Sequence, residues 1–372
     1  MTMLLAILAI VTGLAYMSQR VTIQYADSGK TRNWDIYLII LLIFLILFAG
    51  LRTRYNDTQN YIFGFQNSTT IRPFLADTSN LSLLENPLFY GFQALVKTFT
   101  NNVNVFFIIC AIIVNTLNVQ FIKRNVDPEN FAFSMFLYTT IGTLMLSIAA
   151  QKQILAMSVL TLALSALFEK KYIRYYIIVF LAGLIHTYAW TFFFLPLLAT
   201  KPWSFRTFIL LIITIVVMYT FQSTISSFLE VADQVGKDIP LEEVFDGNQI
   251  NILRVSVYAV VPLIALFFKG LINDNINRRN GIFIQMSIIS LVFMLMGTQN
   301  GANMFGRCAN YFEIGSICAL PWVIKQLFTR ESILIVLTCA IICFGGFYIS
   351  DNNNFNIEYQ SKSFFQFISE II

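Results

Sequence analysis

Long apolar runs recur along the whole of this chain, and they restrict the folds that it can adopt. About 20 consecutive apolar residues are needed to cross the roughly 30 Å hydrocarbon core of a bilayer as a helix. Of the 372 residues, 57% are hydrophobic and only 12% are charged, too few charges to cover the surface of a water-soluble globule. We therefore predict an all-α polytopic membrane protein, a single integral membrane domain over residues 1–372 with about ten crossing helices. The predicted crossings are 1–17, 34–51, 103–122, 131–149, 152–169, 206–222, 252–269, 282–298, 308–326 and 332–350.

Three other apolar stretches do not have the length or pattern of a single crossing. Residues 87–100 are too few, and we expect a re-entrant or interfacial helix there. Residues 172–200 are too many and have cations at both ends, so we expect two half-helices that enter and leave on one side, with His186 near the turn. Residues 355–372 place large apolar side chains on one helical face, which predicts an interfacial C-terminal helix.

Lysine and arginine in the short loops predict the orientation, because cytoplasmic loops carry an excess of both. The loop 223–251 holds six acids and one lysine, so we place it outside, together with the polar loop 52–86. Clusters of cations mark the predicted cytoplasmic side near residues 20–32, 123–124, 170–174, 201–206, 269–279 and 325–330.

The stretch from Arg52 to Tyr61 is unusually polar for a segment that directly follows an apolar run. It holds Arg52, Arg54, Asp57 and two tyrosines within ten residues. One interpretation is a pair of arginines that extend to the membrane edge beside a local counter-ion. The other is an anion-binding and proton-handling site, because a guanidinium donates two parallel hydrogen bonds to a phosphate and a carboxylate can take a proton.

Other chemically active residues fall at the same predicted outer ends of membrane segments. Lys152 and Arg307 lie there against the usual charge bias, and Glu85 and His186, the one histidine, are predicted nearby. We expect these residues and Arg52 to line one outward-facing cavity. Each has a structural alternative: Lys152 can extend to the interface, His186 can be a hydrogen-bonded helix end, and Glu85 can mark a helix start.

Missing motifs narrow the chemistry further. The sequence has no Gly-rich phosphate loop, no His-Glu-x-x-His and no Asp-x-Asp pair, so we expect neither a metal nor a cofactor. The five cysteines lie in apolar runs without metal-ligand spacing. The net charge of +4 is scattered over loops with no basic block, so we expect no nucleic-acid partner.

Five short motifs follow one another along the chain in an order that resembles a known family. They are Gly50-Leu51-Arg52 through Asn56-Asp57 to Tyr61, Glu85-Asn86-Pro87-Leu88-Phe89, Gln151-Lys152-Gln153-Ile154-Leu155-Ala156, Phe180-Leu181-Ala182-Gly183-Leu184-Ile185-His186 and Arg307-Cys308-Ala309-Asn310-Tyr311-Phe312. Together they resemble the EpsG family of Wzy-type polysaccharide polymerases. Two positions depart from the family pattern: Lys152 stands where an arginine is usual, and Asn86 is inserted between Glu85 and Pro87.

The resemblance implies a membrane glycosyltransferase with a fold related to the GT-C class. Such a polymerase moves a growing glycan from polyprenyl (undecaprenyl) diphosphate onto a lipid-linked repeat unit, at the outer face of a bacterial cytoplasmic membrane. The implied partners are these lipid-linked oligosaccharides, membrane lipid, and flippase and chain-length regulator proteins. The implied catalytic residues are Arg52, Asp57, Lys152, His186 and Arg307, and the implied substrate-binding residues are Arg54, Tyr61, Glu85, Gln153 and Tyr311. Asp57, Glu85 and His186 all stay candidates for the base.

Three other classes of function were compared with this pattern. A flippase of the same lipid-linked sugar would need ionisable residues near the middle of the membrane, whereas here they cluster at segment ends. A ligase that passes finished glycan to another acceptor has the same donor requirements as a polymerase. An acyltransferase would need a polar partner for its histidine, and the segment around His186 offers none.

Overall fold

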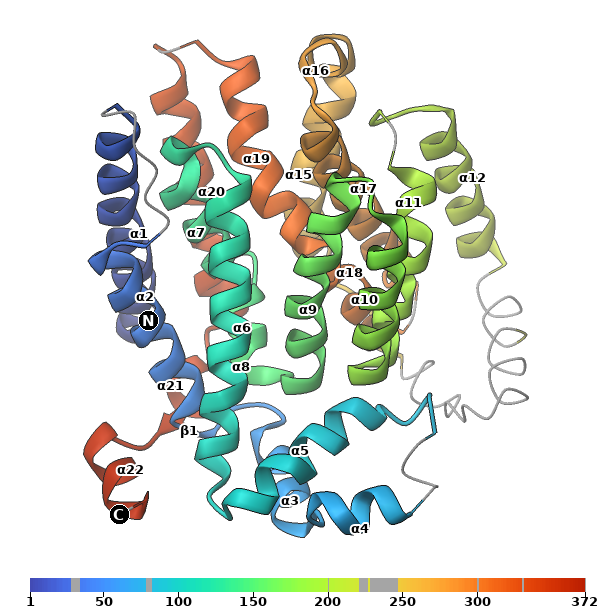
Figure 1. The fold of residues 1–372 in the computed structure, drawn as a ribbon. Coiled ribbons are helices and arrows are strands. Elements are labelled where there is room, and N and C mark those ends of the chain that lie inside the picture. Colours follow the sequence, from blue (N-terminus) through green and yellow to red (C-terminus); the bar gives the residue numbers. More distant parts are fainter. Residues whose placement is uncertain are drawn as a thin grey trace. The chain divides into compact units, whose positions relative to one another are not determined.

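The computed structural model describes residues 1–27, 34–77, 82–199, 201–220, 227, 247–299, 301–329 and 331–371. Helices form most of this part of the chain, with one small two-stranded sheet (Figure 1). The predicted all-α class is therefore confirmed. Contacts divide the chain into two compact units, Met1–Trp190 with Tyr348–Ile372 and Thr191–Phe347.

Several helices have the length and apolar composition of membrane crossings. Five among the described residues meet both conditions, or seven if two bent helix pairs are each one crossing, which supports the predicted multi-pass membrane protein. The five are α1 (Thr2–Asp27), α6 (Val103–Asn125), α9 (Gln151–Phe168), α17 (Arg278–Met296) and α20 (Ile333–Asp351).

Two of the predicted crossings are bent. The first consists of η2 (Pro128–Asn130) and α7 (Phe131–Thr140), followed by α8 (Thr143–Ala149), with a bend of 46°. Gly142 at this break has φ of +136°, a conformation that glycine adopts easily. In the second, α15 (Ile252–Phe267) and α16 (Lys269–Asn275) meet at 84°.

Other apolar helices are shorter than the crossings predicted for them. They are α2 (Ile36–Gly50) and α12 (Phe205–Tyr219), with 15 residues each. The long run 172–200 is interrupted as expected: α10 (Tyr172–Ile185) ends at His186, and η3 (Thr187–Phe194) and α11 (Leu195–Leu198) follow.

The first unit is built on close helix contacts. The end of α2 packs against α6 so tightly that a Cβ on Gly50 would lie 2.5 Å from Ile108.

At the other end of these helices, Lys123 forms an ion pair of 2.8 Å with Asp35, which is 2% exposed. Ser18 of α1 donates to the same carboxylate at 2.7 Å. Lys123, which we counted as a loop cation, is therefore a buried partner that links three helices.

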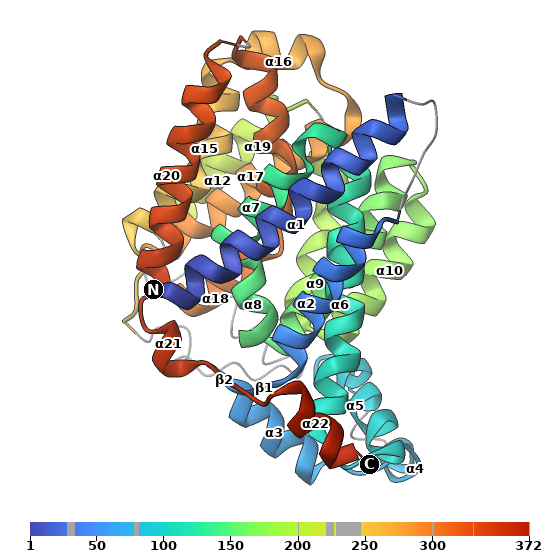
Figure 2. The same cartoon turned by 90° about the vertical axis from the view of Figure 1, so that its left-hand side faces the viewer.

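Short elements gather at one end of the long helices of this unit (Figure 2). The strand β1 (Arg52–Arg54) pairs antiparallel with β2 (Gln360–Ser361) from the C-terminal tail. The helix predicted over 355–372 is interrupted by this pairing, because β2 uses its backbone groups for the sheet. The remaining short elements at this end are α3 (Thr58–Asn67), α4 (Ile71–Ala76), α5 (Pro87–Phe99), α21 (Phe355–Glu358) and α22 (Phe364–Ile371).

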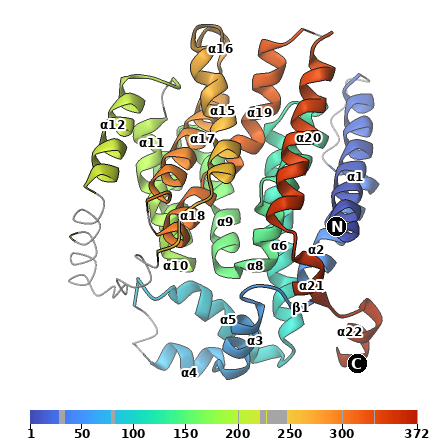
Figure 3. The ribbon, with the colours of Figure 1, turned by 180° about the vertical axis from the view of Figure 1, so that it is seen from behind.

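The second unit is organised around α17, which packs against α15, α18 (Ala302–Asn310) and α19 (Glu313–Leu327) (Figure 3). The crossing predicted over 308–326 begins later than expected, because the chain breaks at Tyr311 and Phe312 between α18 and α19. Most of the predicted outer loop 223–251, with its acids, lies outside the described residues.

Candidate functional site

Arg52 follows α2 directly, and its side chain turns back into the protein, where it is 1% exposed. One terminal guanidinium nitrogen donates to the carbonyl of Ala49, and the other donates to the side-chain oxygen of Gln151. The guanidinium carbon lies 4.1 Å from the centre of the Phe107 ring. Burial lowers the pKa of Arg52 to about 10, so the side chain keeps its charge at neutral pH. Arg52 is thus a buried cation that joins α2, α6 and α9.

The chain around Arg52 is held from a second side. The Asn104 side chain, in the first turn of α6, donates to the carbonyl oxygens of Gly50 and Arg52, each at 3.2 Å. The Gly50 carbonyl is in the last turn of α2, where carbonyls have no partner within the helix, and the Arg52 carbonyl belongs to β1. The position of the Arg52 backbone is therefore fixed independently of its side chain.

Lys152 comes directly after the partner of Arg52, at the start of α9. Its backbone N–H donates to the hydroxyl of Tyr61 at 3.3 Å, and its ammonium group donates to the hydroxyl of Tyr90 at 3.2 Å. The ammonium nitrogen also lies 5.2 Å from the centre of the Tyr90 ring. Lys152 is part-exposed and Tyr90 is 40% exposed, so this cation, unlike Arg52, is open to the surroundings.

The Glu85 and His186 motifs meet through the inserted residue Asn86. Asn86 is the N-cap of α5 with φ of 54°, and its side-chain oxygen accepts a hydrogen bond from the Thr187 N–H at 3.1 Å. Thr187 follows His186, where α10 ends. His186 is 8% exposed and its ring lies 5.2 Å from that of Tyr188, between centres. The insertion thus connects two of the motifs instead of separating them.

The glycine of the His186 motif has a packing role. A Cβ on Gly183 would lie 2.2 Å from the indole nitrogen of Trp190, so no larger residue fits while the indole keeps this position. Trp190 comes four residues after His186. The close approach of its ring to α10 fixes the path of the chain on both sides of His186.

The two carboxylates among the predicted site residues differ in exposure. Asp57 is half-buried at the N-cap of α3, but its side chain does not bond to the first turn. Its backbone carbonyl accepts from the Tyr61 N–H at 3.1 Å, so Asp57 and Tyr61 share this turn. Glu85 is exposed directly before Asn86.

The C-terminal tail covers the segment that carries Arg52. The Lys362 N–H donates to the Leu51 carbonyl at 2.9 Å, and the Tyr359 hydroxyl donates to the Phe48 carbonyl at 2.7 Å. Burial raises the pKa of Tyr359 to about 12, so the hydroxyl stays protonated and can donate. The Tyr359 ring stacks on Phe48 with 5.1 Å between centres. Sequence alone gave no signal for this contact, because β2 has only two residues.

The last motif belongs to the second unit. Arg307 lies in the final turn of α18 and is part-exposed, and Tyr311, which follows this helix, is 2% exposed beside Phe192. Next to this motif, Glu313 is 1% exposed and accepts a hydrogen bond from the Tyr258 hydroxyl at 2.7 Å. The convergence of Arg307 with the cations of the first unit stays a prediction.

A family model described as the EpsG family matches residues 35–368, nearly the whole chain and all five motifs. The chain belongs to the EpsG family. This is a family of proteins like the Wzy-type polymerases, so the chain is a membrane protein of the polysaccharide-polymerase type. No curated protein and no solved structure matches it. The expected relation to the GT-C class stays a prediction.

The two departures from the EpsG pattern have different surroundings. The Asn86 side chain accepts a hydrogen bond from Thr187 and so has a structural role. Lys152 keeps the charge of the usual arginine, but its ammonium group, bonded here to Tyr90, is a point charge without the two parallel donors of a guanidinium. Of the other predicted substrate-binding residues, Arg54 is exposed, Tyr61 is part-exposed and Gln153 is 2% exposed.

Several residues that build this EpsG site were not among the sequence candidates. Gln151 carries the contact to Arg52, and its signal was a glutamine at the start of an apolar helix. Asn104 gave the same kind of signal, a polar group in an apolar run. Tyr90 gave none, since tyrosines are common at membrane interfaces. No group of three or more metal-ligating side chains occurs among the described residues.

Proposed function

We propose that this EpsG-family protein is a polysaccharide polymerase that uses a polyprenyl-diphosphate-linked donor. It transfers the growing glycan onto a sugar hydroxyl of a second lipid-linked repeat unit. The reaction faces the outside of a bacterial cytoplasmic membrane, where substrate tails stay in the lipid and the sugars extend into water.

One observation carries this proposal: direct contacts link four of the five family motifs within one compact unit. Arg52 bonds to Gln151, Tyr61 bonds to Lys152, and Asn86 bonds to Thr187 beside His186. Arg52 and Thr187, the outermost of these residues, are 135 positions apart in the sequence (187 − 52). Polar residues from distant segments that meet at one end of membrane helices are typical of a functional site. Removing such residues from water costs free energy, and a function is the usual reason that they are retained.

The contacts support different roles for Lys152 and Arg52. Lys152 is part-exposed and its ammonium group is held on the Tyr90 hydroxyl, so we assign it to the diphosphate of the donor. Arg52 is buried, and its terminal nitrogens are bonded within the protein. We assign Arg52 a positioning role, in which its charge and its bond to Gln151 hold the start of α9 and therefore Lys152.

The proposed reaction is a displacement at the anomeric carbon of the donor sugar. The bond from this carbon to the diphosphate oxygen breaks, and a bond to the acceptor hydroxyl oxygen forms. Negative charge develops on the leaving diphosphate, where a fixed cation lowers the barrier. The proton of the acceptor hydroxyl passes to a protein base.

Asp57 is the base that these contacts favour. A base must reach the hydroxyl, and Asp57 is half-buried in the turn that also holds Tyr61, the hydroxyl partner of Lys152. Glu85 is exposed, and His186 is 8% exposed within a helix break. We propose Asp57 as the base, with Glu85 and His186 as the alternatives, and Arg307 as a second cation for the developing charge.

Glycan analysis in cells tests this function against its alternatives. In a strain that lacks the protein, single repeat units should accumulate on the lipid at the outer leaflet, and the wild-type gene should restore long polymer. Lipid-linked units confined to the inner leaflet would instead indicate a flippase. Long lipid-linked polymer without transfer to a final acceptor would indicate a ligase.

The proposed orientation has its own test, because it decides which side the site faces. Cysteines placed singly at Asn60 and at Lys170, two exposed positions of the first unit, are labelled in intact cells in a cysteine-free background. We expect a membrane-impermeant reagent to label position 60 and not position 170. The reverse pattern would place the site in the cytoplasm and contradict the proposed donor side.

A further inference from the structure

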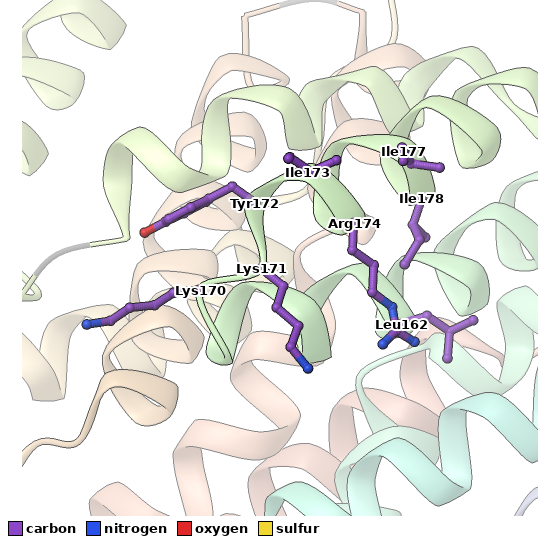
Figure 4. Close-up of a pocket in the computed structure, with 8 residues that line it drawn as sticks. All are labelled: Leu162, Lys170, Lys171, Tyr172, Ile173, Arg174, Ile177 and Ile178. Carbon is purple, nitrogen blue, oxygen red and sulfur yellow. The ribbon is translucent and has the colours of Figure 1, made fainter.

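A second polar feature of the first unit lies at the end of α9 away from Lys152. About 25 Å separates the two ends of this helix, given 1.5 Å per residue over Gln151–Phe168. Here a cavity of about 830 Å³ opens beside the turn between α9 and α10. Its lining includes three cations, Lys170, Lys171 and Arg174, and none of the site residues described above (Figure 4).

The groove lining is divided between charge and apolar surface. Arg174 and Ile178 are four residues apart and share one face of α10, and Lys171 directly precedes this helix as its N-cap. In Figure 4 Lys171 and Arg174 extend on the side where Leu162 of α9 lies, whereas Lys170 extends away to the left. The groove thus has cations at the helix start and aliphatic side chains further along the membrane helices.

The backbone adds to the positive character of this groove. Lys171 is the N-cap of α10, no side chain among the described residues caps this end, and its first turn contains no acid. The helix dipole at such an end favours an anion. Ile173 is 80% exposed and Ile177 is 56% exposed, so apolar surface for a hydrocarbon chain continues beside the cations.

We propose that this groove binds an anionic phospholipid, with its phosphate on Lys171 and Arg174 and an acyl chain along Ile178 and Leu162. The charge pattern supports a negative headgroup, and the apolar continuation supports an attached hydrocarbon chain over a free phosphate. The volume is within the range of small-molecule sites, which is about 300–1,000 Å³.

Glu169 provides a built-in competitor for this ligand. Its carboxylate lies 2.6 Å from the Lys171 ammonium, and both side chains are more than half exposed. A lipid phosphate must replace this carboxylate as the partner of Lys171. Removal of the Glu169 charge should therefore strengthen lipid binding, whereas removal of the cations should weaken it.

Native mass spectrometry of the full-length protein in a nonionic detergent tests the proposal with phosphatidylglycerol and phosphatidylcholine as probes. We expect preferential binding of phosphatidylglycerol, a loss of about tenfold or more in the Lys171→Gln/Arg174→Gln variant, and a gain in Glu169→Gln. The matched control is Arg20→Gln/Arg124→Gln, which removes the same charge from exposed positions of the same unit. This control should bind as the wild type does.

Three results would overturn the assignment. Equal losses in the two double variants would show general charge attraction without a site. Equal binding of the two lipids would exclude a role of the headgroup charge. Competition by inorganic phosphate at concentrations similar to those of the lipid would show a soluble-anion site. Thermal unfolding of each variant checks that the fold is intact, and since none of these residues is in the proposed polymerase site, polymer synthesis should persist.

Discussion

The side-chain oxygen of Asn86 accepts a hydrogen bond of 3.1 Å from the backbone N–H of Thr187, 101 residues further along the chain. Asn86 is the residue by which the Glu85 motif departs from the EpsG pattern. In the structure it begins α5 and fixes the chain directly after His186. The inserted residue therefore connects the Glu85 motif with the chain directly after the His186 motif.

Substitution of Asn86 separates its backbone role from its side-chain role. Asn86→Gly keeps the left-handed conformation and loses one hydrogen bond, so we expect a loss of about 1 kcal/mol in the free energy of unfolding. Asn86→Ala adds strain of about 1–2 kcal/mol for alanine in this conformation. The control Asn60→Ala, on the exposed face of α3, should change little. Equal stability of the alanine and glycine variants in denaturant titrations would contradict this account.

Arg52 and Gln151 should behave as a coupled pair. Removal of either side chain leaves a buried polar group without its partner, which costs about 1–3 kcal/mol. In a double-mutant cycle with Arg52→Ala and Gln151→Ala, the coupling energy should be about 1.5–3 kcal/mol. Both variants should also lose polymer synthesis, because Lys152 is no longer held. Additive effects would contradict the coupling of the two side chains. An inactive Arg52→Ala with wild-type stability would instead indicate direct contact between Arg52 and substrate.

The tail contact predicts a measurable role for one hydroxyl group. Tyr359→Phe removes the bond to the Phe48 carbonyl but keeps the stacked ring, so stability should fall by about 1 kcal/mol. Tyr55, whose ring lies 6.4 Å from that of Tyr359 between centres, provides the control Tyr55→Phe in the same aromatic cluster. We expect a smaller change there in thermal unfolding. Equal shifts in the two variants would show that the rings alone, and not the hydroxyl, hold the tail.

The buried Asp35–Lys123 pair should be costly to break and tolerant of joint replacement. Asp35→Asn leaves the Lys123 ammonium buried without an opposite charge, a loss of about 3–5 kcal/mol. Asp35→Asn/Lys123→Met removes both charges and should recover most of this loss. The exposed Glu169–Lys171 pair is the control, where Glu169→Gln should leave stability unchanged. A double variant as unstable as Asp35→Asn would contradict the electrostatic cause.

Sequence reasoning predicted the features that depend on local pattern. The apolar runs gave the helical membrane class, and the break at His186 and the start of α5 at Pro87 were found as expected. Contacts now link the segments that carry Arg52, Tyr61, Lys152 and His186, and the roles of these residues stay predictions.

The features that sequence missed depend on contacts between distant residues. Burial of Arg52 follows from its contacts with Gln151 and Phe107, and no local pattern indicates them. In the sequence Lys123 follows an apolar run, as a loop cation does. Only its ion pair with Asp35 in the structure shows that its side chain is buried. The pairing of β1 with β2 joins residues more than 300 positions apart.

Lys152 is the residue on which the proposed mechanism depends most. It is the part-exposed cation of the linked motifs, and its contacts with Tyr61 and Tyr90 place it between α3 and α5. Removal of a group that stabilises charge in the transition state lowers the rate by about 10²–10³. Because Lys152 is not buried, its loss should leave the free energy of unfolding nearly unchanged. Lys152→Arg, which restores the usual family residue, should keep activity.

The most direct measurement uses purified protein in liposomes that contain a polyprenyl-diphosphate-linked repeat unit as both donor and acceptor. The length of the glycan products is followed by gel electrophoresis with time. We predict a ladder of polymers from the wild type and from Lys152→Arg, and a rate about 10²–10³ lower from Lys152→Ala at unchanged melting temperature. Polymer at the wild-type rate from Lys152→Ala, or no polymer from folded wild-type protein, would contradict the account.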